Sequence, residues 1–259
     1  MPPERTRRIF AMGGGGFTME PEVPALDHFL LSLTGKREPR LLYLPTASGD
    51  PVEQVDRFHA AYDGTAAATT VLSLFRLHEN PVALHGLVLG HDLVYVGGGS
   101  MRNMLAIWRE HGLDAILREA WEHGIVLAGL SAGAMCWFAG GITKSGGRPA
   151  PIAGLGLLPY SFSAHRDGDP DRLPAYREAV RTGALPAGWA ADDGVGLLFE
   201  GDRLVMAVSS RPGAGAARIE ADGTETEIAV QELPRADDRA LRPVPHDILE
   251  FRALRRARG

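Results

Sequence analysis

The first part of the chain alternates short apolar runs with stretches of helical period, and this alternation constrains the fold more than any other feature. Five apolar runs, rich in β-branched and aromatic residues, are predicted to be strands: 7–14, 40–48, 68–75, 92–100 and 124–131. Their hydrophobicity is continuous, as in parallel strands that are covered on both faces. Between them, 52–62 and 103–124 carry apolar residues at helical spacing. The pattern therefore predicts βαβ units and a doubly wound α/β fold with a mostly parallel sheet.

The second part of the chain has a different pattern, which predicts a β-rich C-terminal part. Segment 140–154 is rich in Gly and Pro and is predicted to be a loop, whereas 170–183 holds one short helix. Segment 195–210 is predicted to be a β-hairpin with Gly201 and Asp202 at its turn. Because no repeat and no long linker divides the chain, we expect a single domain.

Composition excludes several classes of function. The domain spans residues 1–259, and its net charge of -5 argues against nucleic acid as the main partner. No apolar run reaches the roughly 18 to 20 residues that span a bilayer, and the N-terminus lacks the apolar region of a secretory signal. The lone Cys136 excludes an intramolecular disulfide framework and a Cys-rich zinc site. We expect a cytoplasmic protein whose basic tail, 252–259, lies in solvent.

Three glycine clusters follow predicted strands: residues 13–16, residues 97–99 and the pair that flanks Ser131. Ligands of an open α/β sheet bind beyond the carboxyl ends of its strands, so these clusters should lie together at one edge. A dinucleotide site would need the spacing G-x-G-x-x-G, but Thr18 and Arg102 stand where its third glycine should be. The sequence has no Walker pattern either, so nucleotide binding is not favoured.

The spacing G-x-S-x-G at 129–133 makes Ser131 a candidate nucleophile. A buried-looking strand precedes it, and 132–138 can begin a helix. In such a strand-to-helix turn the serine hydroxyl is exposed, and the helix N-terminus and the N–H of Ala132 would face a developing oxyanion. The alternative is an ordinary serine N-cap, and the motif alone does not decide between the two.

A serine nucleophile needs a base and a carboxylate that orients the base. Of nine histidines, His165 stands out, because it lies in a polar loop after an apolar run; the alternative is an exposed loop histidine. Asp192 and Asp193 precede a predicted strand and could reach across to it. Asp167 and Asp169 are too close to the histidine in sequence to be favoured.

Together, four features resemble the peptidase E (aspartyl dipeptidase) family of serine peptidases, which is related to cyanophycinase. They are VGGG with a polar residue at 96–100, G-x-SAGA at 129–134, a loop that ends in His165, and an acidic residue before Gly at 193–194. The resemblance covers most of the chain, roughly residues 7 to 211, and implies a class I glutamine amidotransferase-like fold.

By position, the resemblance makes Ser131 the nucleophile, His165 the base and Asp193 the acid of a catalytic triad. The family commonly has Glu in the last place, so the choice between Asp192 and Asp193 stays open. The resemblance also implies an oxyanion hole built from the backbone N–H groups of Gly98 or Gly99 and of Ala132.

The resemblance implies substrate contacts as well. Arg172 falls near a family arginine that grips the aspartate side chain of the substrate; the alternative is a solvated arginine at a helix start. We therefore expect a serine peptidase of small peptides, including dipeptides with N-terminal Asp, that needs no metal or cofactor and binds neither nucleic acid nor membrane. A homodimer is the expected assembly.

Three alternatives stay open. The first is a cyanophycinase-like hydrolase of an Asp–Arg polymer, and the second is an inactive amidotransferase-like binding protein. The third is an α/β-hydrolase, whose chain order of Ser, Asp and His would recruit His246 as the base.

Overall fold

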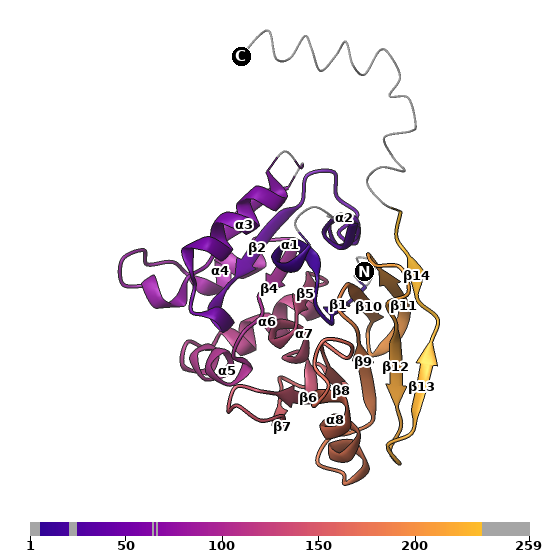
Figure 1. The fold of residues 1–259 in the computed structure, drawn as a ribbon. Helices are drawn as coiled ribbons and strands as arrows, with labels where there is room; N and C mark the ends of the chain where they lie inside the picture. Colours follow the sequence, from indigo (N-terminus) through magenta and orange to yellow (C-terminus); the bar gives the residue numbers. More distant parts are fainter. Residues whose placement is uncertain (1–5, 21–24, 64, 66, 235–259) are drawn as a thin grey trace, which may run out of the picture.

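Two β-sheets form the centre of the fold (Figure 1). The computed structural model describes residues 6–20, 25–63, 65 and 67–234. The first sheet has the order β14-β11-β10-β1-β5-β4-β2-β3. Its strands are β1 (Arg8–Met12), β2 (Arg40–Leu44), β3 (Ala68–Val71), β4 (Leu93–Val96), β5 (Val126–Leu130), β10 (Val195–Glu200), β11 (Arg203–Ser209) and β14 (Gln231–Glu232).

The five strands predicted from the apolar runs are neighbours in this sheet and pair in parallel with one another. The pairs β1–β5, β5–β4, β4–β2 and β2–β3 are all parallel. Every residue of β4 and β5 is buried, which explains why their hydrophobicity is continuous. The predicted hairpin is also present, since β10 and β11 pair antiparallel around a turn in which Gly201 has a φ of 61°.

Helices cover both faces of the first sheet, as a doubly wound fold requires. On one face Phe17 and Phe58 belong to a buried cluster with Tyr43 and Tyr95, and on the other face Trp108 belongs to a second cluster. The helices of the first face are α1 (Gly16–Met19), α2 (Ala25–Ser32) and α3 (Val52–Tyr62); those of the second are α4 (Leu84–Leu89), α5 (Met101–Glu110), α6 (Leu113–Glu122) and the short α7 (Ala132–Met135). Single 3-10 turns lie at Thr46–Ser48 and Leu74–Arg76. In the part of the chain that the structure describes, no helix is both long and apolar enough to span a membrane.

One helical stretch of the prediction is in fact two helices. The segment 103–124 carries apolar residues at helical spacing, but its helices α5 and α6 are separated at Gly112, whose φ is 64°. A left-handed residue cannot continue an α-helix, so the chain turns there.

The second sheet holds the β-rich part of the chain, in the order β13-β12-β9-β8-β6-β7. One face of it packs on α8 (Arg172–Arg181), which is the helix predicted within 170–183. The other face shares the large core cluster of the first sheet through Phe138, Phe162 and Trp189. Its strands are β6 (Phe138–Thr143), β7 (Ala150–Ala153), β8 (Leu158–Ser163), β9 (Gly188–Ala191), β12 (Ala216–Ile219) and β13 (Glu225–Ile228).

The prediction of a loop at 140–154 is wrong, because β6 and β7 form an antiparallel pair there. The glycines reflect close packing within the sheet. A Cβ at Gly140 would lie 2.8 Å from the carbonyl oxygen of Ile152, and a Cβ at Gly141 would lie 2.5 Å from that of Phe162. The basic tail lies outside the described residues.

A buried carboxyl group lies beneath the first sheet's aromatic cluster. Asp27 of α2 is 1% exposed, and its Oδ1 accepts a hydrogen bond of 2.8 Å from the Tyr62 hydroxyl. Burial raises the pKa of Asp27 from 3.8 to about 6. A carboxyl whose pKa is higher in the folded state lowers stability as pH rises between the two pKa values, and the cost stays constant above the higher one.

We therefore predict that Asp27→Asn, which cannot ionise, gains stability relative to wild type between pH values of about 4 and about 8. The relative gain should be about 3 kcal/mol, the free-energy equivalent of the pKa shift. Urea unfolding of both proteins at the two pH values measures it. The exposed Asp56→Asn on α3 serves as the control and should show no such gain. A pH-independent difference for Asp27→Asn would contradict the prediction.

Candidate active site

The predicted glycine clusters do lie together at the carboxyl ends of neighbouring strands. Residues 13–16 follow β1, residues 97–99 follow β4, and Ser131 follows β5. A Cβ added to Gly98 would lie 3.4 Å from the Cβ of Ser131. This edge of the first sheet therefore surrounds Ser131 with closely packed main chain.

Ser131 lies on a sharp and strained turn between β5 and α7. Its φ of 53° and ψ of -116° are unusual for a residue with a side chain. The turn also requires the two flanking glycines: a Cβ at Gly129 would lie 2.2 Å from the carbonyl oxygen of Gly133, and a Cβ at Gly133 would lie 2.3 Å from that of Val96. Although Ser131 occupies the N-cap position of α7, its hydroxyl makes no capping hydrogen bond. The structure therefore does not support the ordinary N-cap.

The side chain of Ser131 instead contacts His165, which in turn contacts Asp193. Oγ of Ser131 lies 2.8 Å from Nε2 of His165, and Nδ1 of His165 lies 2.5 Å from Oδ1 of Asp193. With the proton on Nδ1, which donates to the carboxylate, Nε2 accepts the hydrogen bond from the serine hydroxyl. Both side chains are mostly buried, with 23% and 18% exposed for His165 and Asp193.

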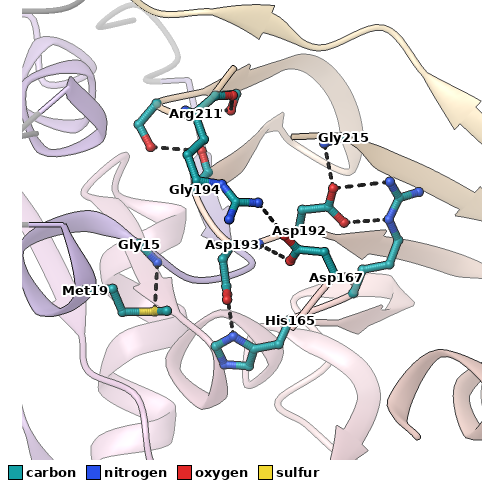
Figure 2. A network of polar contacts seen from close by, with 12 residues as sticks. Gly15, Met19, His165, Asp167, Asp192, Asp193, Gly194, Arg211 and Gly215 are labelled. Carbon is teal, nitrogen blue, oxygen red and sulfur yellow. Dashed lines mark hydrogen bonds and ion pairs between the residues drawn. The ribbon is translucent and has the colours of Figure 1, made fainter. Parts of the chain in front are cut away.

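The structure separates the two candidate aspartates, which follow β9. Asp193 points to His165, whereas Asp192 faces away from it (Figure 2). The Asp192 carboxylate accepts hydrogen bonds from Nε of Arg166 at 2.7 Å and from the Gly215 N–H at 2.8 Å. The chain turns directly after Asp192, where its carbonyl oxygen accepts the N–H of Val195 at 3.2 Å, and of the two carboxylates only that of Asp193 contacts the histidine.

The two nearer aspartates also have other partners. Asp167 accepts a hydrogen bond of 2.9 Å from the main-chain N–H of Asp193 and forms an ion pair with Arg211. Asp169 lies 3.0 Å from Nζ of Lys144. Sequence reasoning weighed these aspartates only as rivals for contact with His165, and it missed Arg211. No local motif marks this arginine, because it comes from the chain after β11.

Of the residues predicted to form the oxyanion hole, two lie directly beside the nucleophile and the third faces another segment. Gly98 packs against the Ser131 side chain, and Ala132 follows Ser131 directly at the start of α7. Gly99 has a φ of 139°, and a Cβ there would lie 2.2 Å from the carbonyl oxygen of Ala47. Its Cα therefore faces Ala47, while the main chain of Gly98 and Ala132 lies beside Ser131.

Arg172 is neither solvated nor free. It is 8% exposed at the start of α8, so the alternative of a solvated helix-start arginine is wrong. Its Nη1 donates a hydrogen bond of 2.9 Å to the carbonyl oxygen of Ile142, and its Nε lies 3.5 Å from Asp169. Two sides of its guanidinium are thus held by groups of the protein.

Cys136 is fully buried, and its Sγ donates to the carbonyl oxygen of Gly133 at 3.1 Å. Burial raises the pKa of this thiol well above its ordinary value, so it is not poised as a nucleophile. Among the residues that the structure describes, no group of three or more His, Cys, Asp or Glu side chains could hold a metal ion. The alternative base, His246, lies outside the described residues.

Comparison with known proteins gives consistent matches over most of the chain. The model of peptidase family S51 matches residues 9–207. A relative from Bacillus subtilis (strain 168), described as the uncharacterized peptidase YgaJ, is 46% identical over 228 residues, which are 88% of this chain and 97% of that protein.

Solved structures match as well. The crystal structure of a peptidase from an acI-B1 actinobacterium has a TM-score of 0.65 at 20% identity and covers 90% of this chain and 98% of its own. A crystal structure of a Listeria monocytogenes EGD-e protein has a TM-score of 0.56 at 17% identity, with 77% and 97% covered. These matches confirm the class I glutamine amidotransferase-like α/β fold. Because the family model spans most of the chain and the Bacillus relative is similar across nearly all of it, this protein belongs to peptidase family S51.

Proposed function

We propose that this protein is a serine peptidase that hydrolyses short peptides through a Ser131–His165–Asp193 triad. The observation that carries the proposal is the continuous hydrogen-bonded chain from the Ser131 hydroxyl, through both ring nitrogens of His165, to the Asp193 carboxylate. Membership of peptidase family S51 supports the same chemistry. The preference for short peptides comes from the family resemblance.

Each triad residue has a defined task in this mechanism. Oγ of Ser131 attacks the peptide carbonyl while Nε2 of His165 takes its proton, and Asp193 stabilises the imidazolium that forms. His165 then gives the proton to the leaving amine, and water releases the acyl group by the same route. The N–H of Ala132, together with that of Gly98 or Gly99, would stabilise the oxyanion. The mechanism uses no metal or cofactor.

The first prediction from this mechanism concerns the nucleophile and the base. Ser131→Ala should lower kcat by a factor on the order of 10⁶, since the attacking oxygen is lost, and His165→Ala should be nearly as damaging. Cleavage of a dipeptide library measures both, and a fluorophosphonate probe should label wild type but not Ser131→Ala. His246→Ala should be close to silent. More than about a tenth of wild-type activity in Ser131→Ala would remove this serine from the mechanism.

The two neighbouring aspartates form a matched pair for the acid. Asp193→Asn should cost several orders of magnitude in kcat, because an amide disturbs the tautomer of His165 and stabilises the imidazolium poorly. Asp192→Asn should cost little activity, although it weakens the contact with Arg166 and so lowers thermal stability. Kinetics well below the melting temperature separate the two effects. A larger loss of kcat in Asp192→Asn than in Asp193→Asn would show that Asp192, and not Asp193, is the acid of the triad.

The preference for N-terminal Asp is the narrowest part of the proposal, and it rests on the family resemblance. The contacts of Arg172 favour a structural role, because Ile142 and Asp169 already hold its guanidinium. We therefore predict that Arg172→Ala lowers kcat/KM for Asp-Leu and Ala-Leu by the same factor and lowers the melting temperature. If kcat/KM instead fell at least about tenfold more for Asp-Leu than for Ala-Leu, the size expected for a charge-assisted contact, Arg172 would be shown to bind the aspartate carboxylate of the substrate.

The same assays distinguish the remaining alternatives. Cleavage of an Asp–Arg polymer in preference to dipeptides would indicate a cyanophycinase-like hydrolase. Absence of both cleavage and probe labelling would indicate a binding protein. The cytoplasmic location and the homodimer stay predictions from the sequence.

A further inference from the structure

We propose that Asp167 is a positioning residue for the active site: with Arg211 it fixes the backbone of Asp193 so that the Asp193 carboxylate stays aligned with His165. The proposal rests on the proposed function for the catalytic roles of Asp193 and His165. Asp167 itself touches neither the nucleophile nor the imidazole in this role, because it acts through the main chain of Asp193.

The contacts form a short chain that ends at the histidine. Oδ1 of Asp167 accepts the main-chain N–H of Asp193 at 2.9 Å, while its Oδ2 pairs with Nη2 of Arg211. Figure 2 shows the Arg211 guanidinium beside Asp193 and Asp167, with Asp193 directed at His165. A chain of hydrogen bonds thus runs from Arg211 through Asp167 and Asp193 to His165.

A second ion pair locks the same two segments from the other side. Asp192 pairs with Arg166. Two consecutive residues of the His165 loop, Arg166 and Asp167, therefore bind the two consecutive aspartates that follow β9. Arg166 and Asp192 are 13% and 8% exposed, and Arg166 also lies 2.6 Å from Glu227 of β13. Asp167 takes no part in this second ion pair, so we expect the pair to persist when Asp167 is replaced. A loss of alignment at Asp193 can therefore be separated from a general loss of structure.

The Asp193 carboxylate has little room to compensate for backbone movement. A Cβ at Gly14 would lie 2.0 Å from its Oδ1, and a Cβ at Gly168 would lie 3.0 Å from its Oδ2. The aspartate side chain is short, so its carboxylate follows any rotation of its own backbone. On the far side of Asp193, the N–H of Gly194 is bound by the carbonyl oxygen of Gly14 at 3.2 Å. The hydrogen bond from the Asp193 N–H to Asp167 holds the near side, so the two bonds together oppose rotation of the Asp193 backbone.

Asp167 is suited to this task because it is held ionised. Partial burial acts to raise its pKa, but the Asp193 N–H and the Arg211 guanidinium outweigh burial and keep the pKa of Asp167 below its ordinary value. An ionised carboxylate accepts from both partners at once.

The test compares Asp167→Ala with Asp167→Asn. Alanine removes the acceptor for the Asp193 N–H, and we expect kcat for the best dipeptide to fall 10- to 100-fold with KM unchanged, as for a small misplacement of a catalytic group. Asparagine keeps the acceptor oxygen, so it should restore kcat to within about fivefold of wild type. Glu178→Ala, which breaks the exposed ion pair with Arg181 on α8, is the matched control and should leave kcat unchanged.

A second readout does not depend on peptidase activity. The Nδ1 proton of His165, shared with Asp193, should give a low-field proton NMR signal in wild type and in Asp167→Asn. We expect it to weaken or move upfield in Asp167→Ala. Failure of the proposed function would appear as a wild-type protein with no cleavage, while this signal would still report on Asp167.

The outcomes decide the proposal. Equal kcat values in Asp167→Ala and Asp167→Asn, or an unchanged signal in Asp167→Ala, would overturn it. Should Asp167→Ala fail to fold, Arg211→Ala releases Asp167 from its ion pair and should lower kcat about three- to tenfold with KM unchanged. An Arg211→Ala protein with wild-type kcat and signal would overturn the proposal as well.

Discussion

Three successive carbonyl groups at the end of β1 hold the backbone of the whole candidate site. Met12 accepts the N–H of Ser131 at 3.1 Å, Gly13 accepts that of His165 at 3.2 Å, and Gly14 accepts that of Gly194, next to Asp193, at 3.2 Å. Side chains at the two glycines would displace this arrangement: a Cβ at Gly13 would lie 2.3 Å from the Asp192 carbonyl oxygen. The close approach of main chain at this strand end is what joins the second sheet, which carries His165 and Asp193, to the first sheet, which carries Ser131.

The same packing sustains unfavourable backbone conformations. Among the described residues, three with side chains have positive φ, namely Asp50, Ser131 and His165, and two of them are members of the candidate triad. Such conformations cost on the order of 1 to 3 kcal/mol each and persist only where the surroundings fix them. Here the N–H groups of Ser131 and His165 are bound by Met12 and Gly13. Both side chains are thus set in position before any substrate arrives.

Sequence reasoning succeeded where one physical signal dominated. Strands buried on both faces read as continuous apolar runs, so β1 to β5 could be predicted, and small residues around Ser131 indicated its turn. It failed where an outcome depended on contacts across the fold. The glycines of β6 looked like loop residues, because their close neighbours, Ile152 and Phe162, come from other strands. The choice between Asp192 and Asp193 was open for the same reason, since it depends on which side of the chain faces His165 after β9.

The ion pairs around the candidate triad affect how the site could bind an acidic substrate. The basic side chains described around the candidate triad already have carboxylate partners: Arg211 pairs with Asp167, Lys144 with Asp169, and Arg166 with Asp192. An acidic substrate side chain that bound one of them would have to displace that partner, so it would gain less than it does at an unpaired arginine. The ion pairs that position the catalytic groups therefore also limit what the site can attract. Binding of a substrate aspartate by one of these three cations requires its ion pair to open, and the half-exposed pair of Arg211 and Asp167 opens at lower cost than the buried pair of Arg166 and Asp192.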